Sequence, residues 1–480
     1  MISALKRLCR TARYLLMSDL RRFLAFLKER YPEEVVEVQA EVDPDYEITA
    51  VVREMEKKTN PVVIFQHPKG SPFPIVANVL GSRKRMALAI ESEPEDFYET
   101  WNRKLQNLVK PRIVESGLVR EVVITGDRVD LTALPIHRYF LQDGGKYITN
   151  ALMVVKDPET GIRNLSYSRA QLVDRTTLRN SMHSRGHQWI IYGKAERMNR
   201  NLEVAIVIGA DPTVLLAAGT RFVPLGLDEY EIAGALLEKP LDLVKGETID
   251  LEVPAGAELV IEGEILAHVR EDEGPFGEYT GYASGRSTRN VLKVKAITHR
   301  KDAYYEDLIS GNSYEHLWLM GVPKQATVFQ RMKQVIPSVK QMYWPISGVN
   351  LLCFVQLAEP VEEGLANLAG TLLLGLDSYV KMVVVVDEDI NIFDEKEVFW
   401  AMATRTNPSK DTNLLHDVFC NRLDPSATET GTVGKMIFDA TKKKGGQYNR
   451  LTLPSEVVER AVKIINALSR GGPRRTTGRG

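Results

Sequence analysis

The segment EGPFGE (residues 273–278) places two carboxylates five residues apart on a stretch that is unsuited to a helix. Pro275 fixes its own φ and disfavours helical geometry at Gly274, while Gly277 permits a positive φ. Like charges held close together raise one another's pKa, and a carboxylic acid tuned towards neutrality can donate a proton. The segment is therefore either a proton-donating site or a solvated acidic turn, and its pattern alone favours the turn.

The composition outside this segment indicates an ordinary globular protein with more than one domain. The 480 residues exceed what one core normally organises, and a net charge of −1 gives no general attraction to nucleic acid. No apolar run approaches the ~18 residues of a membrane-spanning helix. The basic stretch 1–17 lacks the cleavage site of a signal peptide. Three widely separated cysteines (Cys9, Cys353 and Cys420) fit reduced thiols, so we expect a cytoplasmic protein that binds neither nucleic acid nor membranes.

Hydrophobic periodicity predicts an N-terminal α/β domain over residues 18–114, after an extension over 1–17. Helices are expected at 19–30 and 48–57, and strands at 35–42 and 61–65. A β-rich domain follows over 115–315, where regularly spaced strands with turn signals predict a barrel or sandwich. Its strands are expected at 119–125, 151–156, 164–169, 188–192, 204–209, 259–265 and 291–298, with one helix at 229–238.

The remaining sequence predicts a second α/β domain over residues 316–465. A strand expected to be fully buried, at 381–386, is preceded by a helix at 365–374 and followed by another at 398–404. The tail 466–480 has no apolar periodicity and is expected to be disordered.

Three further positions carry polar groups that could form a site. The stretch NLSYSR (164–169) gives most of a strand to polar or amphipathic side chains, although an edge strand with a solvated face explains it as well. His187 enters an expected strand, and Glu229 begins an expected helix, where the helix dipole favours negative charge. Taken singly, His187 and Glu229 are more simply explained as structural residues.

Taken together, these positions resemble the UbiD-type decarboxylases, which use prenylated flavin mononucleotide (prenylated FMN). The matching blocks run in family order from about residue 18 to 441: EVDPDYEIT, PKGSPFPIVANVLGS, the Asn164 and Arg169 pair, His187, DEYEIAGAL (228–236), EGPFGE, KMVVVVDEDIN (381–391) and GKMIFDAT (434–441). The resemblance implies a multi-domain α/β (α+β) fold. In it a central split β-barrel of the flavin-reductase kind holds the cofactor between the two α/β domains.

The resemblance also implies a metal and cofactor site. Its divalent-metal ligands would be Asn164, His187 and Glu229, a mixed, oxygen-rich set that suits Mn²⁺ or Mg²⁺ next to the flavin phosphate. Potassium accompanies the metal in the family, and carbonyls of residues 218–221 would bind it. The implied cofactor contacts are Asn164, Ser166, Tyr167, Ser168, Arg169, His187, Glu229 and Lys435.

The implied catalytic residues are Arg169, Glu273 and Glu278. Arg169 would pair with Glu273 and orient the substrate carboxylate, for which a planar guanidinium is well suited. The family reaction passes through an adduct of substrate and flavin, which loses CO₂ before a glutamate protonates the remaining carbon. That assignment requires a neutral Glu278 beside a charged Glu273. The reverse reaction would use the same residues.

The sequence favours one substrate only narrowly. Arg175, Arg179, His183 and Arg185 lie between Arg169 and His187, where a substrate phosphate would bind well. A solvated or ion-paired basic loop is an equally good explanation. The narrow preference is trans-anhydromevalonate 5-phosphate, from the archaeal mevalonate route to isoprenoids. A 4-hydroxybenzoate-type acid of quinone biosynthesis is the alternative.

Two other functional classes compete with a decarboxylase. An oxidoreductase with ordinary FMN could use a similar barrel, but hydride transfer does not require two carboxylates beside an arginine. A non-catalytic subunit is disfavoured by the intact set Arg169, Glu273 and Glu278. The expected partners are a small carboxylic acid, a flavin prenyltransferase that supplies the cofactor, and further copies of the chain in a dimer or higher homo-oligomer.

Overall fold

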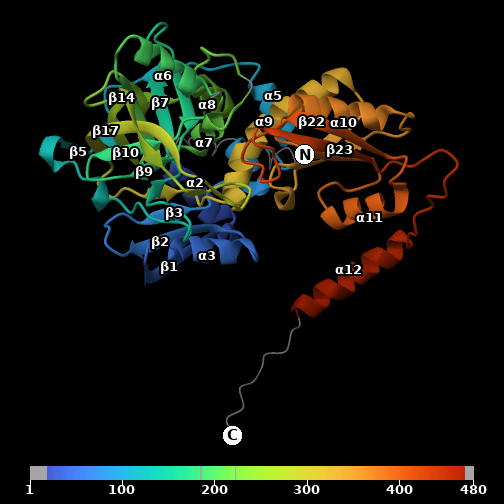
Figure 1. The fold of residues 1–480 in the computed structure, drawn as a ribbon. Coiled ribbons are helices and arrows are strands. Elements are labelled where there is room, and N and C mark those ends of the chain that lie inside the picture. Colours follow the sequence, from blue (N-terminus) through green and yellow to red (C-terminus); the bar gives the residue numbers. More distant parts are fainter. Residues whose placement is uncertain (1–18, 184–185, 222, 471–480) are drawn as a thin grey trace.

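The computed structural model describes residues 19–183, 186–221 and 223–470, and Figure 1 shows their arrangement. The expected extension 1–17 and residues 471–480 of the expected tail lie outside the described residues. An N-terminal α/β layer packs against a large curved sheet, and a C-terminal α/β domain lies beside both. Within the described ranges, no helix is both long enough and apolar enough to span a bilayer.

The N-terminal layer is a four-stranded sheet in the order β1-β2-β3-β18 with its covering helices. Its last strand, β18 (Tyr305–Asp307), comes from much later in the chain, inside the range expected for the central domain. The predicted helices and strands of this region are confirmed. The elements are α2 (Leu20–Arg30), β1 (Val35–Val42), α3 (Glu47–Glu56), β2 (Val62–Pro68), β3 (Ile75–Ala77), α4 (Arg83–Ala89) and α5 (Phe97–Lys104).

The central domain is built on a nine-stranded antiparallel half-barrel, as predicted. Its longest hairpin pairs β14 (Leu259–Glu273) with β17 (Ser287–His299), so the first glutamate of EGPFGE ends a central strand. The other strands of the sheet are β5 (Val122–Thr125), β6 (Tyr147–Ile148), β7 (Leu152–Lys156), β8 (Arg163–Tyr167), β9 (Ala170–Leu172), β10 (Thr177–Asn180) and β11 (Leu202–Ile208).

Smaller elements complete the central domain. The helices are α6 (His187–Arg197), α7 (Pro212–Ala218) and α8 (Glu229–Leu237). A three-stranded sheet contains β4 (Arg112–Ile113), β12 (Asp242–Lys245) and β13 (Glu252–Pro254), and β15 (Phe276–Gly277) pairs with β16 (Ala283–Ser284).

The strand predicted at 188–192 was wrong, because these residues belong to helix α6. Trp, Ile and Tyr favour strands by propensity, and that composition led to the prediction. The buried side chains nevertheless follow the helical period, in which every third or fourth residue faces the core. They are Gln188, Ile191, Tyr192 and Ala195.

The C-terminal domain is a five-stranded sheet in the order β19-β20-β21-β23-β22, with the three central strands parallel. Helix α10 packs on one face of this sheet and α11 on the other, as predicted. The elements are α9 (Tyr314–Val335), β19 (Val339–Tyr343), β20 (Leu352–Leu357), α10 (Leu365–Leu376), β21 (Met382–Asp387), α11 (Glu395–Arg405), β22 (Thr412–Phe419) and β23 (Thr432–Asp439).

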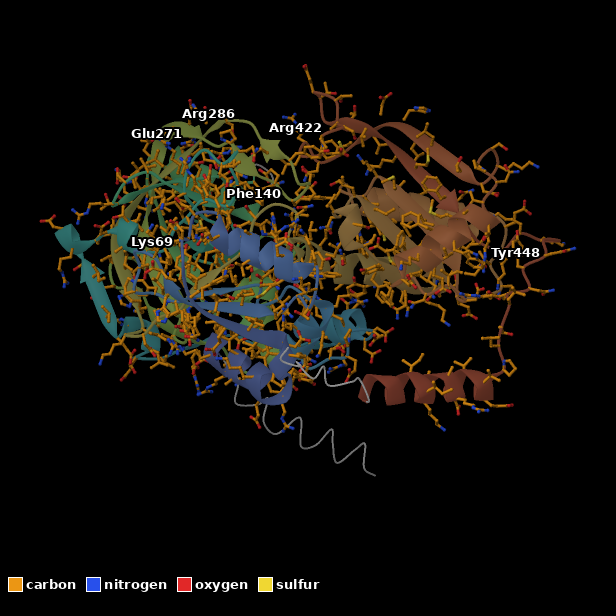
Figure 2. The ribbon with its side chains drawn as sticks, turned by 90° about the horizontal axis from the view of Figure 1, so that it is seen from below. Lys69, Phe140, Glu271, Arg286, Arg422 and Tyr448 are labelled. Atoms are coloured by element: carbon orange, nitrogen blue, oxygen red, sulfur yellow. The ribbon has the colours of Figure 1, made fainter. Side chains whose placement is uncertain are left out.

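The last helix, α12 (Ser455–Arg470), continues past residue 465, where the sequence predicted the start of disorder. It stands apart from the rest of the molecule, beyond Tyr448 (Figures 1 and 2).

Glu315 joins helix α9 to the N-terminal layer through a buried carboxyl group. One carboxyl oxygen accepts the backbone N–H of Leu80 at 2.6 Å, and the residue is only 3% exposed. Burial raises the pKa of Glu315 to about 8. Between its unfolded value of 4.5 and about 8 the folded chain binds the extra proton, so this group lowers stability as the pH rises.

Replacing Glu315 by Gln should remove this pH dependence, because the amide resembles the neutral acid and can still accept from Leu80. We expect similar melting temperatures at pH 5 and a melting temperature roughly 2–4 °C above wild type at pH 8. Thermal unfolding at both pH values measures this, with Glu99→Gln on the surface as control. Parallel pH profiles for Glu315→Gln and wild type would contradict the assignment.

Candidate active site

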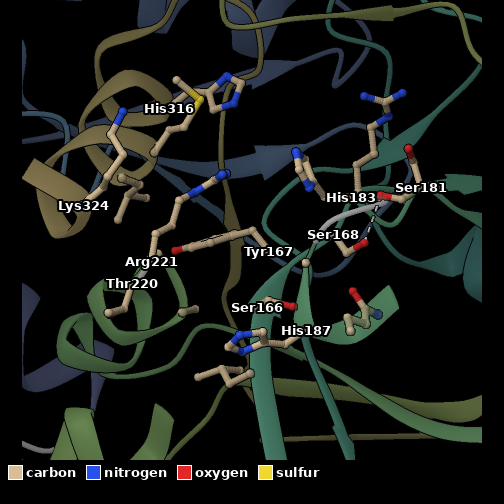
Figure 3. Close-up of a pocket in the computed structure, with 18 of the residues that line it drawn as sticks. Ser166, Tyr167, Ser168, Ser181, His183, His187, Thr220, Arg221, His316 and Lys324 are labelled. Atoms are coloured by element: carbon tan, nitrogen blue, oxygen red, sulfur yellow. Dashed lines mark hydrogen bonds between the residues drawn. The ribbon is translucent and has the colours of Figure 1, made fainter. Parts of the chain in front are cut away.

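A cavity of about 510 Å³ lies between the half-barrel and the C-terminal domain. Strand β8, the first turns of α6 and α8, the EGPFGE segment and helix α9 all contribute to its wall. Its volume falls within the range of cofactor and small-ligand sites. Figure 3 shows Arg221, His316 and Lys324 approaching from one side of the cavity, and Ser168, Ser181 and His183 from the other.

Arg169, just after β8, holds both glutamates of EGPFGE. Its Nε and Nη2 donate to the two carboxylate oxygens of Glu273 at 2.8 and 3.1 Å, and its Nη1 donates to Glu278 at 2.6 Å. The glutamates are 1% and 7% exposed, and the Phe276 ring lies 4.4 Å from the guanidinium carbon. The predicted Arg169–Glu273 pair is confirmed. The two glutamates do not lie in separate environments, because both carboxylates bond to one guanidinium.

The charge of this cluster depends on Arg169. Burial lowers the pKa of its guanidinium, but the adjacent Glu278 and Glu273 carboxylates outweigh burial and raise that pKa overall. The next cation, Arg289, has its Nε 3.8 Å from Glu273. Arg169 is therefore the principal counter-charge for two buried carboxylates.

The three residues predicted as metal ligands all line the cavity and belong to three different elements. Asn164 lies on β8, and its amide donates to Glu229 at 2.9 Å, while the Leu165 N–H donates to the same carboxylate at 2.8 Å. In the described part of the chain, the Asn164 carbonyl oxygen is buried without a hydrogen-bond partner. Burial raises the pKa of Glu229 to about 8. A buried carboxylate beside an unsatisfied carbonyl oxygen fits a bound cation.

His187, the third predicted ligand, begins helix α6 and lines the cavity. Burial lowers the pKa of its imidazole, which favours the neutral form that binds metals. The start of α8 is fixed by Asp228, which accepts the Tyr230 N–H at 3.0 Å and pairs with Arg163 at 2.7 Å. This cap holds Glu229 at the wall of the cavity rather than in solvent.

Most of the other predicted cofactor contacts line the cavity. Ser166, Tyr167 and Ser168 all face it, and the Ser168 hydroxyl donates to the Ser181 carbonyl at 3.0 Å (Figure 3). Lys435 does not line it. Its ammonium is buried against the carbonyls of Leu374 and Ser378, at 3.5 and 3.4 Å, and so supports a segment that does reach the cavity.

The basic cluster predicted to bind a substrate phosphate is not assembled. Arg175 pairs with Asp130 at 3.0 Å and Arg179 with Glu271 at 2.8 Å, and neither arginine lines the cavity. For these two residues the ion-paired alternative is correct. His183 does line the cavity, and Arg185 lies outside the described residues.

The basic residues that α9 brings to the cavity, His316 and Lys324, were not predicted from the sequence. His316, Met320 and Lys324 follow one another at intervals of four residues along one helix face, a signal that the sequence contained. Lys324 pairs with Asp377 at 2.7 Å and lies 4.5 Å from the Tyr379 ring centre.

Three sequence profiles of one family cover most of the chain. They describe the N-terminal domain (residues 27–105), the Rift-related domain (112–313) and the C-terminal domain (317–440) of 3-octaprenyl-4-hydroxybenzoate carboxy-lyase, named UbiD. The chain belongs to the UbiD family. An anhydromevalonate phosphate decarboxylase from Methanothermobacter thermautotrophicus is 32% identical to it, over 86% of this chain and 95% of that protein.

Solved structures of UbiD-class enzymes share the fold over nearly the whole chain. HmfF from Pelotomaculum thermopropionicum, in complex with FMN, is 40% identical with a TM-score of 0.87, over 91% of this chain and 98% of that one. An evolved dimeric form of HmfF in complex with prFMN is 38% identical with a TM-score of 0.84, over 92% of this chain and 98% of that one. The vanillic acid decarboxylase of Sedimentibacter hydroxybenzoicus, in closed form, is 32% identical with a TM-score of 0.79, over 94% of this chain and 99% of that one.

Removing the shared guanidinium should destabilise the protein strongly. Arg169→Met leaves two buried carboxylates without their main counter-charge, which we expect to cost about 3 kcal/mol in the free energy of unfolding. Urea denaturation measures it. The matched control Arg175→Met breaks an exposed ion pair and should cost less than about 1 kcal/mol. Equal losses in the two variants would show that Arg169 does not carry the cluster.

Proposed function

We propose that this UbiD-family enzyme decarboxylates an α,β-unsaturated or aromatic carboxylic acid, reversibly and without net oxidation, with prenylated FMN in the cavity. The observation that carries the proposal is one guanidinium shared by two buried carboxylates at the wall of a cavity of cofactor size. Complexes of related HmfF structures with FMN and prFMN support the choice of cofactor. A flavin prenyltransferase would supply it.

The donor set described above would hold the ions that accompany the cofactor. Asn164, His187 and Glu229 would bind Mn²⁺ or Mg²⁺ next to the flavin phosphate, and carbonyls of residues 218–221 would bind K⁺. When bound, the prenylated flavin supplies the electron sink for the pair of electrons left behind as CO₂ departs.

The protein's own residues would bind the carboxylate and move a proton. The substrate carboxylate takes the place of Glu278 at Nη1 of Arg169, while Glu273 keeps its two hydrogen bonds to the same guanidinium. Glu278 then takes up a proton from water, because a third carboxylate at one guanidinium lacks a counter-charge. After CO₂ leaves, Glu278 gives this proton to the carbon atom that had carried the carboxylate. Reversal of these steps carboxylates the product.

For the substrate we propose trans-anhydromevalonate 5-phosphate, an intermediate of archaeal isoprenoid synthesis. The Methanothermobacter relative supports it, and so does Arg221 at the cavity wall, whose guanidinium donates to the Tyr379 hydroxyl at 3.0 Å and could instead bind a phosphate. The second candidate is a 4-hydroxybenzoate-type acid. The vanillic and 3,4-dihydroxybenzoic acid decarboxylases among the structural neighbours favour it.

We also propose that the enzyme is a homo-oligomer, a dimer or larger. The apolar side chains of α12 support this, since Val457, Val462 and Ile464 are 52%, 49% and 53% exposed. A 16-residue helix that stands alone in water is marginally stable and gains most from packing this face. Light scattering of the full chain tests it, and a monomer at micromolar concentration would contradict it.

A substrate panel tests the reaction class and the substrate together. Protein co-expressed with a flavin prenyltransferase should release CO₂ from trans-anhydromevalonate 5-phosphate, and hydroxybenzoic acids should react at least tenfold more slowly. Turnover of hydroxybenzoic acids alone would replace the first substrate by the second. NAD(P)H oxidation with unmodified FMN and no CO₂ release would favour an oxidoreductase instead.

Replacing Glu278 by Gln should abolish proton donation without disturbing binding. We expect flavin and metal contents equal to wild type and a kcat lower by on the order of 10²-fold or more. Steady-state assays with flavin absorbance and metal analysis measure this. Full activity of Glu278→Gln would refute the proton-donor role.

Replacing His187 by Ala should remove a metal ligand. Divalent-metal content by mass spectrometry should fall severalfold and flavin retention should weaken. The exposed His268, which bonds to Asn199 at 2.9 Å, provides the control His268→Ala. Unchanged metal content in His187→Ala would return His187 to a structural role.

A further inference from the structure

The backbone that carries Glu278 is fixed at consecutive peptide groups. The Gly277 carbonyl accepts the Gly311 N–H at 3.1 Å, and the Glu278 N–H donates to the Tyr282 carbonyl at 2.9 Å. The Gly277 N–H donates to a side-chain oxygen of Asp143 at 2.9 Å. Of these three contacts, only the one from Asp143 comes from a side chain, so only this one can be altered by substitution without changing the backbone.

Asp143 lies in a loop that packs closely against EGPFGE. It is 4% exposed, and its other carboxylate oxygen accepts the N–H groups of Tyr139 and Phe140 at 3.1 and 2.9 Å. One residue on, the Gly144 N–H donates to the Pro275 carbonyl at 2.7 Å. A Cβ added at Gly144 would lie 2.1 Å from the Gly274 carbonyl oxygen, so the two backbones touch.

Phe140 fills the space beside the same peptide. A Cβ added at Gly277 would lie 2.6 Å from Cδ2 of Phe140, and one at Gly311 would lie 2.9 Å from the same ring. The positive φ in the segment, +93°, belongs to Gly274. Gly277 is needed for space rather than for its backbone angle.

We propose that Asp143 is a positioning residue, whose hydrogen bond to the Gly277 amide presents the Glu278 carboxylate to the cavity at Arg169. The proposal rests on the proposed function, in which Glu278 transfers the proton. The three hydrogen bonds that the Asp143 carboxylate accepts all come from backbone N–H groups, and its charge therefore serves to fix the backbone. Such charge-assisted bonds are stronger than those between neutral groups.

The substitution Asp143→Asn acts selectively on this contact. The single amide oxygen can keep the two N–H groups of Tyr139 and Phe140, which leaves the NH₂ group facing the Gly277 N–H. Two donors then oppose each other at Gly277, while the loop keeps its own bonds. The matched control is Asp45→Asn. The Asp45 carboxylate accepts the N–H of Arg138, five residues before Asp143, at 3.0 Å, and none of its hydrogen bonds in the described residues involves EGPFGE.

The experiment measures exchange and kinetics on the same holoenzyme. In Asp143→Asn, hydrogen exchange of a peptide covering 274–282 should quicken at least tenfold, and kcat should fall on the order of tenfold with KM and flavin content unchanged. Asp45→Asn should match wild type in each. If Asp143→Asn folds poorly, Asp143→Ser takes its place. The serine side chain is too short to reach Gly277, so the same changes in exchange and kcat are expected.

Each result decides the proposal. Unchanged exchange over 274–282 would show that Asp143 does not fix the peptide. Faster exchange with unchanged kcat would show that turnover does not depend on fixing it. A rise in KM with constant kcat would assign Asp143 to substrate binding. If wild type decarboxylates no acid, the proposed function fails, and the exchange comparison alone decides whether Asp143 holds the Glu278 backbone.

Discussion

The site depends on one guanidinium that balances two carboxylates buried almost completely. Moving two like charges out of water is costly, and the geometry of Arg169 offsets this cost with three charge-assisted hydrogen bonds. The half-barrel positions these side chains relative to one another, because β14 ends at Glu273 and β8 ends just before Arg169. A substrate carboxylate that binds Arg169 must disturb this balance, and that disturbance is what would turn Glu278 into an acid.

A third buried carboxylate, that of Glu229, lies at the same cavity and has no arginine paired with it in the described residues. Glu229 receives hydrogen bonds from Asn164 and from the Leu165 backbone, and burial raises its pKa to about 8. Where the Arg169 cluster is complete without a ligand, the Glu229 group leaves an oxygen of Asn164 unsatisfied. The cavity therefore combines an acid pair that shares one guanidinium with a donor set suited to a cation, as a decarboxylase with a phosphorylated cofactor would need.

Local patterns in the sequence predicted much of the fold and the centre of the site. Periodicity located α2, α10 and β21 because each buries one face or nearly all of itself. The prediction failed at α6, where β-favouring side chains follow a helical period. It also failed for Arg175 and Arg179, because the acids that neutralise them, Asp130 and Glu271, lie across strand pairings that the sequence does not reveal. The role proposed for Asp143 could not be predicted for the same reason, since it depends on a hydrogen bond to backbone 134 residues away.

The most direct test of the central claim is the origin of the new hydrogen in the product. Decarboxylation in D₂O, followed by mass spectrometry, should give wild-type product with one deuterium at the carbon that lost CO₂, delivered through Glu278. Product without deuterium would show that the hydrogen does not come from a solvent-exchanging acid. That result would contradict proton delivery by the carboxylates at Arg169.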